Sequence, residues 1–203
     1  MEMLSYEIVV NLTKDIFVFA AMPAILVYVF GKYKEFKNKN EERISVLSAL
    51  HAELSSLDML ICSREEQYLE FAYEGNKHIF FPYISITLNY FSVFDNISSK
   101  FGLINNQDAI EQIIKCYIEV KGLFDDVKDL EYYAKRILTF PFEVDATQRY
   151  REVLINNYTQ NLKNIVDFQL PMVKGLIKQS LQCIEEEKNK IKSKNTLRGF
   201  LFG

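Results

Sequence analysis

Apolar residues between positions 36 and 74 recur at alternating spacings of three and four, which predicts one long amphipathic helix. The stripe resembles a coiled-coil seam of about four heptads, has one break at Arg64, and ends before Gly75-Asn76. Its members are Leu47, Leu50, Leu54, Leu57, Ile61, Tyr68 and Phe71. We expect this seam to pack within the chain, with a seam between two copies as the alternative.

A second, shorter helix is predicted after Phe80-Phe81-Pro82, because proline suits the first turn of a helix. Gly102 is the expected end. Its apolar face comprises Ile84, Leu88, Phe91, Phe94, Ile97 and Phe101.

A third helix is predicted over residues 107–139, with Asn105, Asn106 or Asp108 available as an N-terminal cap and a break at Phe140-Pro141. One side of it carries Ile110, Ile113, Ile114, Tyr117, Ile118, Leu123 or Phe124, Val127, Leu130 and Ile137.

The fourth predicted helix covers residues 146–192, capped by Asp145 or Thr147 and kinked near Pro171. Its periodic apolar residues are Tyr150, Val153, Leu154, Tyr158, Leu162, Ile165, Phe168, Leu176, Leu181 and Ile184.

The fold class that follows is all-α: an up-down antiparallel bundle of about four long helices. The chain has 7 Gly and 4 Pro among 203 residues, so helix breakers are few. No segment shows the alternation of a strand. Short connections favour antiparallel neighbours, and a fourth helix would return the C-terminus to the side where the first helix begins.

Residues Ile16–Gly31 form an uncharged run that predicts a transmembrane helix near the N-terminus. At about 1.5 Å per residue the run is shorter than a hydrocarbon core of about 30 Å, so flanking residues would extend it. Pro23 should kink it mildly. The alternatives are a signal peptide, which should have a basic start, and a buried core helix.

A lysine cluster at Lys32, Lys34, Lys37 and Lys39 follows the run. The positive-inside rule then places the N-terminus outside and the following domain in the cytoplasm. Free thiols suit that compartment: Cys62, Cys116 and Cys183 are far apart and odd in number, and we expect them to be mostly buried.

The resulting domains are an N-terminal segment with its anchor (1–35), a cytoplasmic helical bundle (36–192) and a basic, then apolar tail (193–203). The net charge is −3, and it is distributed as an acidic middle between two basic ends. The acidic middle is unlike a nucleic-acid-binding protein, and the basic ends suit an anionic membrane surface. We predict membrane-surface contact for Lys32, Lys34, Lys37, Lys39, Lys190, Lys192, Lys194, Arg198, Phe200 and Phe202.

The sequence gives no motif for catalysis, a cofactor or a metal. The two histidines, His51 and His78, lack metal-site partners, and no glycine-rich phosphate loop is present. We therefore predict a non-enzymatic protein without a cofactor or an evident small-molecule substrate. Two acidic clusters are interpreted as solvated faces, the second being followed by lysines that can pair with it along the helix. They are Asp125, Asp126, Asp129 and Glu131, and Glu185, Glu186 and Glu187.

The layout resembles a loose group of bacterial and prophage proteins that have one N-terminal span and a helical cytoplasmic domain. The likeness lies in the anchor followed by lysine, the Ala49-x-x-Ala52-Glu53-Leu54 segment, Phe81-Pro82 and Cys116-Tyr117-Ile118. Some members of this group lie among phage-defence genes. The resemblance implies an inner-membrane location and no catalytic residues.

Together these features predict an interaction module, a sensor or adaptor held at the inner leaflet, with a protein partner or a second copy as its target. The alternative is a self-assembling effector that perturbs the bilayer, for which Ala20, Ala21 and Ala24 would permit close packing between spans.

Overall fold

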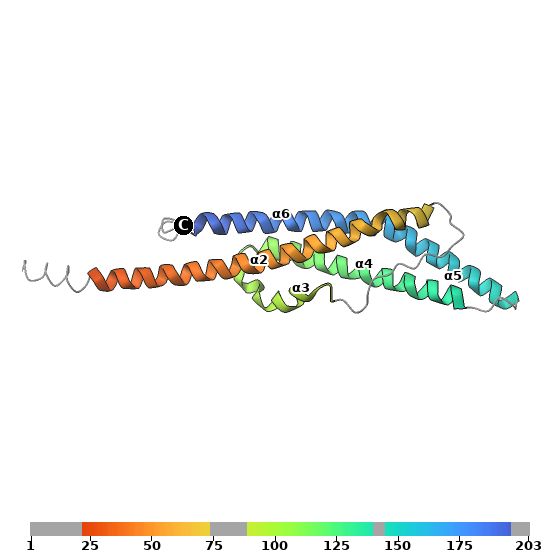
Figure 1. Ribbon diagram of the computed structural model, residues 1–203, viewed down its shortest axis with the longest axis horizontal. Coiled ribbons are helices and arrows are strands. Elements are labelled where there is room, and N and C mark those ends of the chain that lie inside the picture. Colours follow the sequence, from red (N-terminus) through yellow and green to blue (C-terminus); the bar gives the residue numbers. More distant parts are fainter. Residues whose placement is uncertain (1–21, 74–88, 140–144, 196–203) are drawn as a thin grey trace, which may run out of the picture. The chain divides into compact units, whose positions relative to one another are not determined.

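A computed structural model describes residues 22–73, 89–139 and 145–195, and every regular element in these ranges is helical (Figure 1). The α-helices are α2 (Met22–Tyr73), α3 (Ser92–Ile97), α4 (Gln107–Thr139), α5 (Asp145–Asn164) and α6 (Leu170–Lys194). A 3₁₀ segment, η2 (Ser98–Leu103), follows α3, and a π-helical segment, η3 (Ile165–Gln169), joins α5 to α6. The all-α class is confirmed, and four helices pack together.

The chain divides into two compact units, one made of residues 46–188 and one of residues 1–45 with 189–203. Within the larger unit, residues successively later in α2 pair with residues successively earlier in the η3–α6 segment, so these helices run antiparallel. The pairs are His51 with Glu185, Glu65 with Lys174, and Tyr73 with Asp167 of η3.

Helix α4 also runs antiparallel to α6. Gln112 bonds to Gln179 near one end of the contact, and Asp126 bonds to Gln169 near the other. Helices α2 and α4 therefore point the same way in this unit, and the α5–η3–α6 segment returns beside them (Figure 1).

The leucine seam of α2 is buried inside this one chain. Leu47, Leu50 and Leu54 have no exposed surface, and Leu57, Ile61 and Tyr68 are buried, while Phe71 is half-buried. The prediction that the seam packs within the chain is confirmed, because its apolar surface is already removed from water without a second copy.

Helix α4 has the predicted bounds, and the Asn106 side chain caps it by accepting a hydrogen bond from the Ala109 N–H at 3.3 Å. Its predicted apolar side is buried or half-buried with one error, Ile118, which is 62% exposed. Ile118 directly follows the buried Tyr117. Because each residue turns the helix by about 100°, the Ile118 side chain points away from the core side that Tyr117 occupies.

The predicted kink near Pro171 takes the form of the π-helical turn η3. Proline has no N–H and its ring crowds the carbonyl four residues earlier, and a wider turn relieves that clash. The extra residue of a π turn shifts the apolar stripe, so Ile165 and Val166 are buried but Phe168 is 70% exposed. The predicted core position of Phe168 is therefore wrong. Tyr150 and Val153 are also exposed, because the buried stripe of α5 is narrow.

The predicted second helix is not continuous over the residues that the structure describes; its start, up to residue 88, lies outside them. Residues 89–91 form a turn, in which the Asn89 side chain accepts a hydrogen bond from the Phe91 N–H at 3.1 Å. Such Asx turns compete with helix formation. From residue 89 on, where the described residues resume, Ser92–Ile97 is the α-helical part before the 3₁₀ segment begins.

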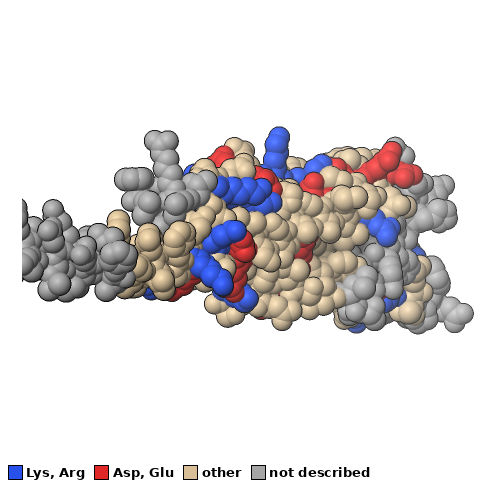
Figure 2. Space-filling view, turned by 60° about the vertical axis from the view of Figure 1, so that its left-hand side comes forward, with Lys and Arg blue, Asp and Glu red and all other residues tan. Residues whose placement is uncertain are grey.

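In the smaller unit, the described start of α2 is apolar and exposed, and Figure 2 shows it in tan. Later in the same unit, Asn40 of α2 and Ile191 of α6 are buried. Among the described residues α2 is the one helix long and apolar enough to be a candidate membrane span, although 33% of its most apolar window is buried, as in a core helix. A signal sequence has the same composition, and the first six residues of the predicted Ile16–Gly31 run lie outside the described residues.

We predict that Leu50→Ala lowers the free energy of unfolding by about 2–5 kcal/mol, because it removes a fully buried side chain and leaves a cavity. Denaturant unfolding of the full chain, followed by helical circular dichroism, measures the change. Met59→Ala is the matched control, since Met59 is 74% exposed on the same helix and should cost less than about 0.5 kcal/mol. Equal losses for both variants would contradict the assignment of the core.

Candidate functional site

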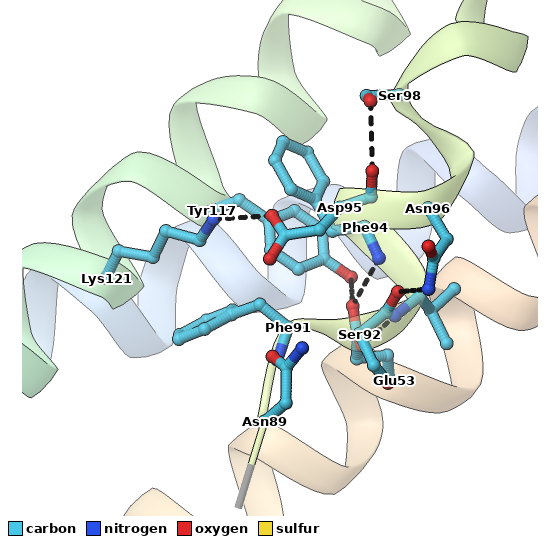
Figure 3. Close-up of polar contacts among 11 residues, drawn as sticks. Glu53, Asn89, Phe91, Ser92, Phe94, Asp95, Asn96, Ser98, Tyr117 and Lys121 are labelled. Atoms are coloured by element: carbon cyan, nitrogen blue, oxygen red, sulfur yellow. Dashed lines mark hydrogen bonds and ion pairs between the residues drawn. The ribbon is translucent and has the colours of Figure 1, made fainter. Parts of the chain in front are cut away.

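The carboxylate of Glu53, which is buried on α2, accepts hydrogen bonds from two other helices of the larger unit (Figure 3). Its Oε1 accepts a hydrogen bond from the Val93 N–H at 2.7 Å, and its Oε2 accepts one from the Phe94 N–H at 3.0 Å. The Tyr117 hydroxyl of α4 donates a third, to Oε2, at 2.8 Å. One carboxylate thus joins α2, α3 and α4.

The local sequence explains why Val93 and Phe94 need this acceptor. Helix α3 begins at Ser92, and the first N–H groups of a helix have no partner within it. The residue before the helix, Phe91, has no side-chain oxygen to act as a cap, and no side-chain cap bond is present there. Glu53 supplies the cap from a different helix, which fixes this segment to α2.

Aromatic rings enclose the carboxylate on the side of α4. The Phe94 ring stacks on the Tyr117 ring with centroids 4.0 Å apart. Phe91 lies edge-on to Tyr117 at 6.3 Å and contacts Phe124 at 5.4 Å. Tyr90 contacts the same Phe124 ring edge-on at 5.3 Å. These rings exclude water from the Glu53–Tyr117 bond, and a drier site strengthens it.

The basic side chain of this cluster, Lys121, binds to Asp95. Its ammonium lies 2.7 Å from the Asp95 carboxylate and sits over the rings of Phe91 and Phe94, at 5.1 and 5.2 Å from their centroids. Figure 3 shows Lys121 directed to Asp95 and away from Glu53. Within the part of the chain that the structure describes, the Glu53 carboxylate is therefore held by three neutral donors and by no cation.

The protonation state of Tyr117 suits its role as a donor. Burial, and then the hydrogen bond and the charge of Glu53, raise the pKa of the Tyr117 phenol above its ordinary value. The neighbouring Cys116 is buried as well, and burial raises the pKa of its thiol to about 11. Both groups stay protonated at neutral pH, and Cys116 is a packed core thiol.

A cavity of about 520 Å³ opens beside the carboxylate, between α2 and the start of α3. Its described lining is mostly small or apolar and comprises Ala49, Ala52, Glu53, Ser56, Leu57, Leu60, Tyr90, Ser92 and Val93. This combination of an apolar wall with one buried polar group is typical of sites for small ligands.

The predicted membrane-surface lysines fall in the smaller unit. Lys32, Lys34, Lys37 and Lys39 are exposed on α2, and Lys190, Lys192 and Lys194 are exposed on the last turns of α6. Lys32 pairs with Glu35 at 2.8 Å, and Lys37 approaches Glu41 at 3.8 Å. The remaining predicted residues Arg198, Phe200 and Phe202 lie outside the described residues.

His51 lies between two polar groups on the surface of the larger unit. Its Nδ1 is 3.4 Å from the Ser55 hydroxyl, and its Nε2 is 3.5 Å from Glu185 Oε1. The order resembles a serine hydrolase triad, but both contacts are long and Glu185 also binds Lys188 at 2.6 Å. Ser55 and His51 sit in the interior of α2, where backbone N–H groups are used by the helix and cannot stabilise an oxyanion. We interpret this group as a surface contact that holds α2 against α6. The second histidine, His78, lies outside the described residues.

Some residues of the two acidic clusters are exposed to solvent, as predicted, and others are buried. Glu131 and Glu187 are buried, which corrects that prediction. Each lies at helical spacing from core residues of its own helix, and Glu131 pairs with Lys135. The predicted pairing of the second cluster with following lysines is confirmed for Glu185 and Lys188.

The described residues contain no group of three or more His, Cys, Asp or Glu side chains that could hold a metal ion. The three cysteines are free, as expected; Cys116 is buried and Cys183 is half-buried, whereas Cys62 is exposed.

Sequence reasoning missed the Glu53 cluster as a site, although a signal for it was present. Glu53 interrupts the seam between Leu50 and Leu54 at the spacing of a core position, and a charged residue there needs partners. The partner segment could not be identified, because backbone N–H groups carry no sequence signature.

Comparisons with family models, with curated proteins and with solved structures found no match.

We predict that Tyr117→Phe lowers the free energy of unfolding by about 1.5–3 kcal/mol, as expected for the loss of a hydrogen bond to a charged group. A double-mutant cycle with Glu53→Gln isolates the bond. In the Glu53→Gln background the same tyrosine substitution should cost clearly less. An unchanged cost in that background would show that the hydroxyl does not depend on the carboxylate.

Proposed function

We propose that the protein is a membrane-anchored, non-enzymatic interaction module, a sensor or adaptor whose helical domain lies at the cytoplasmic face of the inner membrane. The observation that carries the proposal is the exposed start of α2. Six large apolar side chains there are between 50% and 73% exposed: Met22, Ile25, Leu26, Val27, Tyr28 and Phe30.

These side chains surround the helix on all sides. Steps of about 100° per residue distribute the six positions over the full circle. A protein groove would cover only one side of such a helix, and water disfavours all sides, whereas lipid covers the whole surface at once. A lipid environment therefore suits this segment better than a partner helix or solvent.

The residues after the apolar stretch support the orientation. Lys32, Lys34, Lys37 and Lys39 are exposed and point to different sides of the helix, as expected for side chains that reach lipid headgroups around it. The exposed Lys190, Lys192 and Lys194 belong to the same unit, so basic groups from both ends of the domain are available to one anionic surface.

An exposed aromatic cluster near the α4–α5 connection supports the interaction role. The Arg136 guanidinium lies over the rings of Tyr132 and Tyr150, at 5.4 and 5.9 Å from their centroids. Leu138 and Val153 are also exposed in these helices. Tyrosine and arginine dominate binding energy in protein interfaces, so this cluster is the surface at which we expect a cytoplasmic protein partner.

We predict that the protein resists extraction from membranes by high salt and is released by detergent. The double variant Leu26→Glu with Phe30→Glu should move to the soluble fraction, because each charge placed in a span costs about 2.5–3.5 kcal/mol. The matched control is Met59→Glu, at an exposed apolar position of α2 beyond the lysines, which should leave fractionation unchanged. A wild-type protein found in the soluble fraction would contradict the anchor.

We also predict that tagged full-length protein, purified from native membranes in mild detergent, carries a stoichiometric partner. Tyr132→Ala with Arg136→Ala should lose that partner, while Ile118→Ala, at an exposed position of the same helix, should retain it. The mass of the complex identifies the alternative, since a homo-oligomer without a partner would favour a self-assembling membrane effector.

A further inference from the structure

We propose that the cavity beside Glu53 binds a small amphipathic molecule with one protonated amine, whose ammonium group bonds to the Glu53 carboxylate. The apolar part of the ligand would lie against the small and aliphatic residues that line the remaining cavity. This site is independent of the membrane anchor and of the aromatic cluster on α4 and α5.

The hydrogen-bonding capacity of the carboxylate leaves a place for the ligand. An ionised carboxylate offers about four acceptor positions on its two oxygens. Among the described residues, donors fill three: Oε2 accepts from Phe94 and Tyr117, and Oε1 accepts from Val93. The open position is therefore on Oε1, the oxygen that caps the start of α3.

The charge of the site favours a cation. Glu53 is the one Asp, Glu, Lys, Arg or His side chain among the described residues that line the cavity. A buried carboxylate held only by neutral donors is stabilised further by a positive charge. Lys121 does not compete for this position, because Asp95 and the Phe91 and Phe94 rings already hold its ammonium.

The shape and lining of the cavity limit the rest of the ligand. About 520 Å³ lies within the range of roughly 300–1,000 Å³ for small-molecule sites. Ala49, Ala52 and Ser56 leave space along α2, while Leu57 and Leu60 provide aliphatic contacts and Tyr90 provides a ring. An aromatic or short aliphatic amine fits this chemistry, and a second charged group would have no described partner in the lining.

The test compares three probes of similar shape on the full-length protein in mild detergent: phenethylamine, phenethyl alcohol and phenylacetate. Isothermal titration calorimetry and thermal melts by circular dichroism report binding. We expect the amine to bind at least tenfold more tightly than the alcohol, and phenylacetate to bind most weakly. Equal affinities for amine and alcohol, or no binding of the amine at millimolar concentration, would overturn the proposal.

Two variants locate the site. Ala52→Leu fills the cavity without removing a contact of Glu53 and should abolish amine binding while the protein keeps its fold. Ser63→Leu, three turns further along the same face of α2, is the matched control and should bind as the wild type does. Glu53→Gln should remove the preference for the amine over the alcohol. Amine binding that survives Ala52→Leu would place the ligand elsewhere and refute the assignment.

Discussion

A buried carboxylate must be satisfied by hydrogen bonds, and this requirement at Glu53 determines how three helices of the larger unit meet. The acid lies on the core stripe of α2, where its neighbours Leu50 and Leu54 are fully buried. Because it is mostly buried there, the chain brings donors to it: two N–H groups at the start of α3 and the hydroxyl of Tyr117. The stacked Phe94 and Tyr117 rings follow from the same geometry, because both residues must approach one carboxylate.

The long helices could be predicted from sequence because their signals are local and repeated. The seam of α2 and the bounds of α4 follow from apolar spacing and from the Asn106 cap, and each signal is supported by several residues. The antiparallel return of α6 follows from the short connections, and the observed pair of Glu65 and Lys174 agrees with it. An all-helical chain can bury its periodic apolar stripes in only a few arrangements of the helices, so the apolar pattern alone predicts much of the fold.

The predictions that failed depend on interactions between distant residues or on a change of helix type. Phe168 faces solvent because a π turn before Pro171 shifts the stripe, and periodicity assumes an unbroken α-helix. In the described part of the helix predicted from Pro82, regular helix begins only at Ser92, because Asn89 accepts a bond from the backbone before it and Glu53, from a different helix, caps its start. Glu131 and Glu187 were assigned to the surface by residue type, but their positions lie on buried faces. The candidate site belongs to this group, since it is formed by one side chain and the backbone of a segment far along the chain.

Helix α2 carries two different side-chain patterns, and the change between them has a physical meaning. From residue 46 onward its apolar residues form a stripe, which is the pattern of a helix with water on one side and protein on the other. Between Met22 and Phe30, the described residues before Gly31, the large apolar side chains face every direction and most are exposed, which is the pattern expected for a helix in a uniformly apolar solvent. The lysines at positions 32, 34, 37 and 39 lie where one pattern gives way to the other, as polar side chains do at a boundary between two solvents. The order of these patterns along one helix supports the proposed anchor better than the length of the apolar run does, because a core helix and a signal sequence share that length and composition.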